Sequence, residues 1–187
     1  MSREAANNVD DSGLQQDKTK SRYRILVVDD QDGTDEELHA ALPAETYEVI
    51  GVCHAAEVPE HFKESVPDVV VLDIYMPDEG KLDAGYRIAW QIRERLQLPK
   101  MRDRLKMLEV PIVAYSNYAY WIDNAENAEE KGQREQEYAR VRRKLRTLAV
   151  YDFIDKNMTD KGEPDPDSVR RLAVRIERII SSLQGEV

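Results

Sequence analysis

The sequence predicts an α/β fold, a doubly wound, five-stranded parallel sheet with helices on both faces. Short apolar runs rich in β-branched residues recur five times along the 187 residues, and such runs are typical of strands buried on both faces. Segments with helical spacing of apolar residues separate these runs, as in βαβ units with right-handed crossovers. Several runs end in a carboxylate, a hydroxyl or a lysine, at the strand ends where such sheets bind ligands.

The individual elements follow from the same patterns. Strands are expected at residues 23–28, 47–53, 69–72, 111–115 and 150–154. Thr34 and Glu37 have capping-box spacing, which predicts a first helix starting there. Further helices are expected at 59–66, from 86 onward with a second stripe on Met101, Leu105 and Leu108, within 121–148, and after Asp165-Pro166, a cap followed by a proline suited to the first helical position.

Composition bounds the function. Hydrophobic residues make up 41% and charged residues 34%, which is typical of one soluble domain, and the net charge of −10 argues against general nucleic-acid affinity. Cys53 is the only cysteine, so neither an internal disulfide nor a cysteine zinc site is expected. With no apolar run of membrane length and no signal core, we expect a cytoplasmic protein. Residues 1–21 are predicted to be a disordered tail, and residues 22–187 the folded domain.

Three carboxylates follow two of the predicted strands. Asp29 and Asp30 come directly after the first strand, and Asp73 comes directly after the third. A lone aspartate at a strand end is more often a turn or cap residue. If the two strands are neighbours, however, three acids converge and repel one another unless a cation lies among them. Mg²⁺ suits a site with few carboxylates and an incoming phosphate.

Two further polar residues, Ser116 and Lys156, follow the fourth and fifth strands. Taken alone, they would be a capping serine and a surface lysine. Together with the acids they form a set suited to phosphoryl transfer, in which a carboxylate is the nucleophile and Asp30 and Asp73 hold the metal. Lys156 would then pair with the phosphate and Ser116 would hydrogen-bond to it.

At these positions the chain resembles the receiver domain of bacterial two-component response regulators, which has a flavodoxin-like fold. The resemblance covers about residues 23–183 and rests on four motifs, Val-Val-Asp29-Asp30, Leu-Asp73-Ile-Tyr-Met-Pro77, Ala-Tyr-Ser116 and Phe153-Ile-Asp-Lys156.

The resemblance implies roles for the acidic residues. Asp73 would be the phosphoacceptor. Asp30, Asp73 and the backbone carbonyl of Tyr75 would ligate Mg²⁺, and Asp29 would act on the metal through water.

The resemblance also implies which residues form the conformational switch and how long the phosphoryl group persists. Ser116 would be the switch hydroxyl, Phe153 the switch aromatic and Lys156 the phosphate-binding lysine. Tyr75 and Tyr118 lie two residues after Asp73 and Ser116, where the family lets water approach the phosphoryl group. Two aromatic rings there predict slow self-hydrolysis.

The expected function is a stand-alone response regulator. A sensor histidine kinase or a histidine phosphotransfer protein would donate the phosphoryl group, and an unknown downstream protein would receive the signal. Because the chain ends at Val187, directly after the last predicted helix, no DNA-binding output domain is expected. Enzymatic activity would be limited to self-phosphorylation and self-dephosphorylation, and a homodimer is left open.

Two alternatives compete with this function. Asn117 stands where the family has a small residue and Asn157 where it has a proline, which leaves open a pseudo-receiver that binds partners without phosphorylation. A phosphatase of the haloacid dehalogenase type also uses a strand-end aspartate, but Tyr75 occupies the position of its second acid.

The third and fourth helical regions are longer than the family's usual ones, mainly at residues 96–109 and 124–146. The segment 121–148 is acidic early and basic late, which suits a helix dipole, although Gly132 is a candidate break. A solvated helix with one core-facing seam is the simpler interpretation, and a partner surface is the sharper one. Nucleic-acid contact by residues 140–146 is opposed by the net charge.

Overall fold

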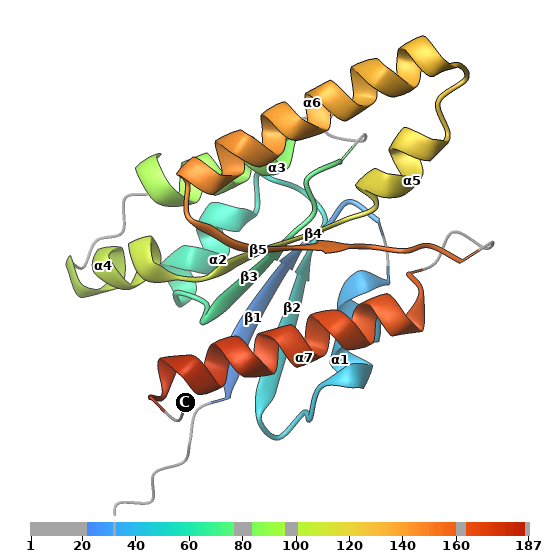
Figure 1. Ribbon diagram of the computed structural model, residues 1–187. Coiled ribbons are helices and arrows are strands. Elements are labelled where there is room, and N and C mark those ends of the chain that lie inside the picture. Colours follow the sequence, from blue (N-terminus) through green and yellow to red (C-terminus); the bar gives the residue numbers. More distant parts are fainter. Residues whose placement is uncertain (1–21, 32, 77–83, 96–100, 160–163, 186–187) are drawn as a thin grey trace, which may run out of the picture.

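Figure 1 shows a computed structural model of the chain, which describes residues 22–31, 33–76, 84–95, 101–159 and 164–185. Five strands form one parallel sheet in the order β2-β1-β3-β4-β5. The strands are β1 Tyr23–Val28, β2 Tyr47–Val52, β3 Val69–Leu72, β4 Ile112–Ser116 and β5 Val150–Asp155. The chain winds outward from β1 in both directions, so the predicted doubly wound α/β fold is confirmed.

Helices cover both faces of this sheet (Figure 1). They are α1 Thr34–Ala41, α2 Val58–Glu64, α3 Ala84–Trp90, the π-helix η2 Gln91–Arg95, α4 Met101–Glu109, α5 Tyr118–Asp123, α6 Ala128–Thr147 and α7 Pro166–Leu183. Helices α1 and α7 pack on one face, and the others share the second core on the opposite face. None of the helices in the described ranges is long and apolar enough to cross a membrane.

The central strand β3 supplies both cores. Val70 and Leu72 face the larger cluster, and Val69 and Val71 face the cluster beneath α1 and α7. All four side chains are buried, because successive side chains of a strand point to opposite faces and both faces are covered. An apolar run without polar alternation therefore marks this strand in the sequence.

Two of the predicted features are wrong. Thr34 and Glu37 do not form a capping box: Gly33, with φ +96°, is the N-cap of α1, and the Thr34 hydroxyl donates instead to Asp29 Oδ2 at 2.7 Å. The Asp29 carboxylate is a charged acceptor for the Thr34 hydroxyl, and hydrogen bonds to ionised groups are among the stronger ones, which favours this contact. Gly132 does not break the fourth helical region, since α6 runs through it.

The predicted apolar stripe of α4 is also wrong. Leu105 and Leu108 are 56% and 48% exposed, whereas Met107 and Val110 are buried in the core. The helix therefore packs on a different side from the one its leucines suggest.

An arginine ties the two elongated regions together. Arg93, on the π-helix, donates to the carbonyl oxygens of Met107 at 3.0 Å, Val110 at 2.7 Å and Leu148 at 3.0 Å. Burial lowers the pKa of Arg93 from its ordinary value. These bonds connect the end of α4 and the end of α6 to the π-helix η2, so both elongated regions are anchored on one side chain. The tail predicted at residues 1–21 lies outside the described residues.

Candidate functional site: an acidic pocket at the strand ends

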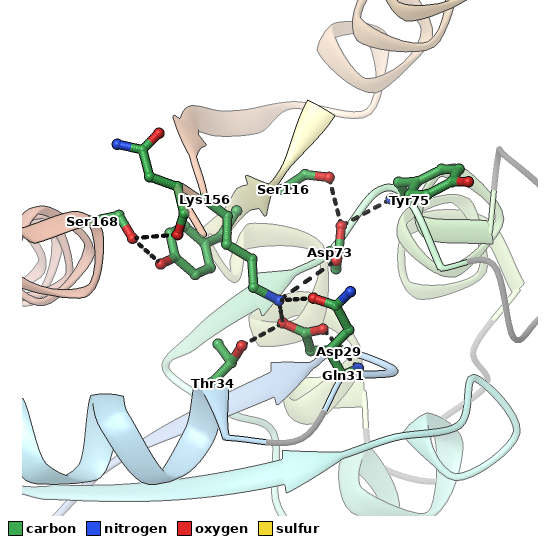
Figure 2. Close-up of polar contacts among 10 residues, drawn as sticks. Asp29, Gln31, Thr34, Asp73, Tyr75, Ser116, Lys156 and Ser168 are labelled. Carbon is green, nitrogen blue, oxygen red and sulfur yellow. Dashed lines mark hydrogen bonds and ion pairs between the residues drawn. The ribbon is translucent and has the colours of Figure 1, made fainter. Parts of the chain in front are cut away.

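Four neighbouring strands deliver polar side chains to one edge of the sheet (Figure 2). Asp29 follows β1, Asp73 follows β3, Ser116 ends β4 and Lys156 follows β5. Backbone bonds hold the ends in register, with Asp73 N donating to the Val28 oxygen at 2.8 Å and Lys156 N to the Ser116 oxygen at 2.9 Å. The structure thus brings together the residues that the sequence placed at strand ends.

The three aspartates converge as well. Asp29, Asp30 and Asp73 each offer a carboxylate oxygen, and these oxygens lie within 4.8 Å of one another. Asp73 is 1% exposed and Asp29 is 5% exposed. Three oxygen donors of like charge, two of them buried, fit a hard divalent cation such as Mg²⁺. The structure has no bearing on the role assigned to the Tyr75 carbonyl, which stays a prediction.

The two carboxylate oxygens of Asp73 have different contacts. Oδ1 accepts hydrogen bonds from the Ser116 hydroxyl at 2.6 Å and from the Tyr75 backbone N–H at 2.9 Å. Oδ2 is buried and accepts no hydrogen bond from any described residue. The bonds to Oδ1 orient the group and leave Oδ2 as the oxygen suited to bind a cation or attack an electrophile.

Burial raises the pKa of Asp73 to about 7, and the nearby Asp29 carboxylate adds to the rise. The Lys156 ammonium and the hydrogen bonds from Ser116 and Tyr75 oppose the rise. The carboxylate therefore needs positive charge nearby in order to be fully ionised near neutral pH.

Lys156 supplies part of that charge from inside the protein. Its Nζ lies 2.6 Å from Asp29 Oδ2, 3.1 Å from Gln31 Oε1 and 3.9 Å from Asp73 Oδ2. The residue is 1% exposed, so it is not a surface lysine. Its closest partner is Asp29 rather than the candidate nucleophile Asp73.

Sequence reasoning missed three residues that shape this pocket. Thr34 and Gln31 bond to Asp29 through the hydroxyl at 2.7 Å and the backbone N–H at 3.0 Å. Gly85 lies so close to the backbone of Asp73 that a Cβ there would come within 2.4 Å of the Asp73 carbonyl oxygen. Gly85 lies in the first turn of α3, against the backbone of Asp73, and a glycine within a predicted helical region was the available signal of such a close approach.

A cluster of aromatic residues lies next to the acidic site. Tyr75 packs edge-on against Tyr118 with ring centroids 6.4 Å apart and lies 5.6 Å from Trp121. Tyr118 in turn stacks on Tyr138 of α6 at 4.1 Å. Helix α5 therefore contacts Tyr75, two positions after Asp73, directly, and α6 is joined to it through Tyr118. The seam foreseen on α6 is present, with Val141 and other apolar side chains facing the core.

Phe153, the predicted switch aromatic, lies half-buried on β5. The guanidinium of Arg142 on α6 lies 4.8 Å from its ring centroid and 5.8 Å from that of Tyr138. Phe153 is thus in contact with the same helix that carries the aromatic seam.

The segment after Lys156 has its own bonding. The Asn157 oxygen accepts from Asp165 N at 2.8 Å, and Met158 forms a bridge with Pro164. No described peptide bond is cis. The position where the family usually has a proline is therefore held by backbone hydrogen bonds across the base of the loop.

Comparison with known proteins identifies the family. A model of the response regulator receiver domain matches residues 25–131, more than half of the 187 residues. The chain belongs to the response regulator receiver domain family. Receiver domains generally bind Mg²⁺ through acidic residues, and they interact with kinases or phosphotransfer proteins.

Curated relatives match over part of their length. Two proteins named probable transcriptional regulator ycf27 are each 34% identical to this chain, one from Guillardia theta over 80 residues and one from Porphyra purpurea over 97 residues. The matches cover 43% and 48% of this chain and 30% and 38% of those proteins. The chain therefore spans about a third of the length of these relatives.

Solved structures support the fold. The CheY-like receiver domain protein from Methanospirillum hungatei JF-1 superposes with a TM-score of 0.55 at 16% identity, covering 89% of this chain and 100% of that one. The chemotaxis response regulator CheY4 of Vibrio cholerae gives a TM-score of 0.53 at 14% identity, covering 85% and 99%. At such identities the likeness concerns the fold alone.

Proposed function

We propose that this receiver accepts a phosphoryl group on Asp73 from a histidine kinase or a histidine phosphotransfer protein in the cytoplasm, and signals through protein contacts. The proposal rests on the burial and the contacts of the Asp73 carboxylate. It is a buried carboxylate with one oxygen fixed by Ser116 and the other without a hydrogen bond from any described residue, 3.9 Å from an ammonium. Such an arrangement suits a nucleophile that receives a charged group.

Each residue of the site would have its own role in the phosphoryl transfer. Asp73 Oδ2 forms a bond to phosphorus while the bond from phosphorus to the donor's histidine nitrogen breaks, and the electron pair of that bond stays on the nitrogen. Lys156 balances the charge of the phosphoryl oxygens, as a buried ammonium does most effectively at close range. Asp29, Asp30 and Asp73 would hold Mg²⁺, which would offset the remaining negative charge.

The same contacts support a switch. Ser116 donates to Asp73 Oδ1 in the unmodified protein, and on phosphorylation it would donate to a phosphoryl oxygen instead. Its movement would release space for Phe153, whose ring lies under Arg142 of α6. Structures with and without a phosphoryl mimic test this. Unchanged positions of Ser116, Phe153 and α6 would exclude the switch.

Mass spectrometry after incubation with acetyl phosphate and Mg²⁺ tests the chemistry. We expect a gain of one phosphoryl group that is lost in Asp73→Asn and after chelation of the metal. Asp123→Asn, an exposed aspartate of α5, is the matched control and should react as the wild type does. An Asp73→Asn protein that gains phosphate at the wild-type rate would overturn the assignment.

A phosphorylation-independent pseudo-receiver is the second candidate, and Asn117 favours it. Asn117 is 8% exposed, and its buried Oδ1 has no hydrogen-bond partner among the described residues. Its amide lies next to Ser116, where the phosphoryl group would be held. Absence of phosphorylation in both wild type and Asn117→Ala would support the pseudo-receiver, whereas phosphorylation of Asn117→Ala alone would show that the amide blocks the site. Hydrolysis of small phosphoesters by the wild type would instead indicate a phosphatase of the haloacid dehalogenase type.

The output arrangement stays a prediction. The matched relatives are much longer than the segment they share with this chain, and their names describe probable transcriptional regulators. A stand-alone regulator without a DNA-binding domain is therefore an expectation from the sequence only, and the sequence leaves a homodimer open. Size-exclusion chromatography with light scattering, before and after phosphorylation, measures the oligomeric state.

A further inference from the structure

A buried pair of hydroxyl groups joins the end of β4 to the start of α7 (Figure 2). Tyr115 directly precedes Ser116 on β4, and its side chain belongs to the core beneath α1 and α7. The Tyr115 hydroxyl lies 2.7 Å from Ser168 Oγ, and both residues are 0% exposed. The Asp73 carboxylate accepts from Ser116 and Tyr75 rather than from this hydroxyl pair. The pair can therefore act on the acidic site only through a neighbouring residue.

The hydrogen bonds of the hydroxyl pair run in one direction. Ser168 Oγ donates to the backbone oxygen of Asp165 at 2.8 Å and lies 3.5 Å from the backbone oxygen of Asn157. A carbonyl oxygen can only accept, and a serine hydroxyl has a single proton, so the proton between the two side chains belongs to Tyr115. Burial raises the pKa of Tyr115 to about 12, so this proton is present at neutral pH. Tyr115 therefore donates to Ser168, which donates to the backbone before α7.

Lys156 is adjacent to the hydroxyl pair through both its backbone and its ammonium. The Lys156 N–H donates at 2.9 Å to the backbone oxygen of the residue that follows Tyr115. On its other side, the Asn157 oxygen accepts from Asp165 N at 2.8 Å and also faces Ser168 Oγ. The Lys156 ammonium lies 6.0 Å from the centroid of the Tyr115 ring. A loss of the Tyr115–Ser168 bond would therefore be felt first at Lys156.

The asparagine at position 157 explains why Lys156 needs such support. The ring of a proline, which the family has at this position, fixes the backbone, whereas an asparagine leaves it free to rotate. A lysine side chain also has several rotatable bonds, so a buried ammonium keeps one position only when its surroundings hold it. In this chain the backbone contacts of Asn157 and the ring of Tyr115 supply those surroundings.

We propose that Tyr115 and Ser168 are positioning residues for phosphoryl transfer, and that their hydrogen bond holds Lys156 where its ammonium reaches the phosphoryl oxygens. In the unmodified protein this ammonium lies 3.9 Å from Asp73 Oδ2. Displacing a group that balances charge in the transition state slows the reaction, because its effect depends on distance and orientation. The inference rests on the proposed function and extends it to two residues that do not touch the phosphoryl group.

The rate of phosphorylation by acetyl phosphate and Mg²⁺ tests the proposal in Tyr115→Phe and Ser168→Ala. We expect each variant to react about tenfold more slowly than the wild type, because the ammonium is no longer held in place. The double variant should be no slower than the slower single variant, since either change already removes the shared hydrogen bond.

Two matched controls should react as the wild type does. Ser182→Ala removes a hydroxyl that donates to the Ile179 oxygen at 2.7 Å, the same local bond on the same helix that Ser168 makes to Asp165. Tyr151→Phe removes the hydroxyl of an exposed tyrosine on β5.

NMR of protein labelled with ¹³C in its lysine side chains gives a readout that does not depend on phosphorylation. The Lys156 Cε signal is assigned by its loss in Lys156→Arg, which keeps the positive charge. We expect this signal to shift in Ser168→Ala and in Tyr115→Phe, which retains the ring, and to stay unchanged in both controls. A pair that only stabilised the fold would leave the signal of the folded protein where it is.

Wild-type rates in both pair variants, losses that multiply in the double variant, or an unchanged Lys156 signal would each overturn the positioning role. A wild type that gains no phosphoryl group would overturn the proposed function instead. The Lys156 signal would then still decide whether Tyr115 and Ser168 position the lysine.

Discussion

Two ion pairs of the same chemistry lie in opposite environments. In the acidic pocket, Lys156 Nζ is 2.6 Å from Asp29 Oδ2, and the two side chains are 0% and 4% exposed. Between α5 and α6, Lys131 Nζ is 2.9 Å from Asp123 Oδ1, with exposures of 47% and 70%. Water screens the second pair, whereas the first has lost its hydration and depends on its partners. Burial, and not charge or distance, therefore decides how much each contact matters.

The largest expected effect follows from removing the buried cation. Lys156→Met should lower the free energy of unfolding by about 3 kcal/mol, because it leaves Asp29 and Asp73 buried without their ammonium. Lys131→Met, the exposed counterpart, should leave the free energy of unfolding almost unchanged, because water screens this pair. Urea unfolding in the presence of a chelator measures both. Equal costs would show that burial does not separate the two pairs.

The next effect is a gain in stability. The folded-state pKa of Asp73 is about 7, above its ordinary value of 3.8, so between these pH values only the unfolded state loses the proton. The metal-free wild type should therefore lose stability as pH rises from about 4 to about 7, and change little above that. Asp73→Asn cannot ionise and should be more stable at pH 8 by on the order of 2 kcal/mol.

Urea unfolding at a series of pH values, with a chelator present, checks this second prediction. Addition of Mg²⁺ should recover the stability of the wild type and leave Asp73→Asn less affected. A wild type that instead becomes less stable as pH falls from 7 to 4, relative to Asp73→Asn, would contradict the sign.

A smaller loss of stability is expected when a threonine hydroxyl is removed, and two threonines in different environments allow a comparison. Thr34 is 1% exposed and donates to the buried Asp29 carboxylate, whereas Thr147 is exposed and donates to the Lys144 carbonyl. Thr34→Val should cost about 1.5 kcal/mol, since a charged acceptor loses a partner inside the protein. Thr147→Val should cost only about 0.3 kcal/mol, because water replaces the bond. Chemical denaturation of both variants would show whether the ranking holds.

The smallest expected effect concerns the lifetime of the phosphoryl group and depends on phosphorylation of Asp73. Tyr118 is 1% exposed and packs against Tyr75, which lies two residues after Asp73. Tyr118→Ala and Tyr75→Asn should each speed phosphate loss about fivefold, which corresponds to about 1 kcal/mol of activation free energy. Tyr151→Ala, an exposed tyrosine of β5, serves as the control. Equal or slower loss in both pocket variants would show that the tyrosines do not shield the site.

The sequence alone predicted the strand ends because the signal is local. An apolar run such as the one before Asp73 is typical of a strand buried on both faces, and the carboxyl ends of parallel strands lie at one edge of the sheet. Asp29, Ser116 and Lys156 are assigned to the same edge, because each stands at the end of another predicted strand. The family motifs lie on the same residues, so the pattern and the resemblance led to one site.

The partners of those residues needed the tertiary structure. Thr34 suits a helix cap by its spacing, but its hydroxyl donates to the Asp29 carboxylate instead, and no local pattern reveals that contact. Leu105 and Leu108 have helical spacing, yet α4 packs through Met107, whose carbonyl oxygen also accepts from Arg93, and both contacts depend on distant parts of the chain.

What the sequence determined is the order of the elements and the set of polar groups at the strand ends, since both depend on periodicity and on chain direction. What only the tertiary structure decided is which of those groups lose water and which side chains meet across the sheet. Lys156 is joined to Asp29 across 127 positions of the chain, and Phe153 lies under Arg142 of the neighbouring helix. Such contacts depend on how helices of particular length and rotation pack over the sheet, and on the burial that results.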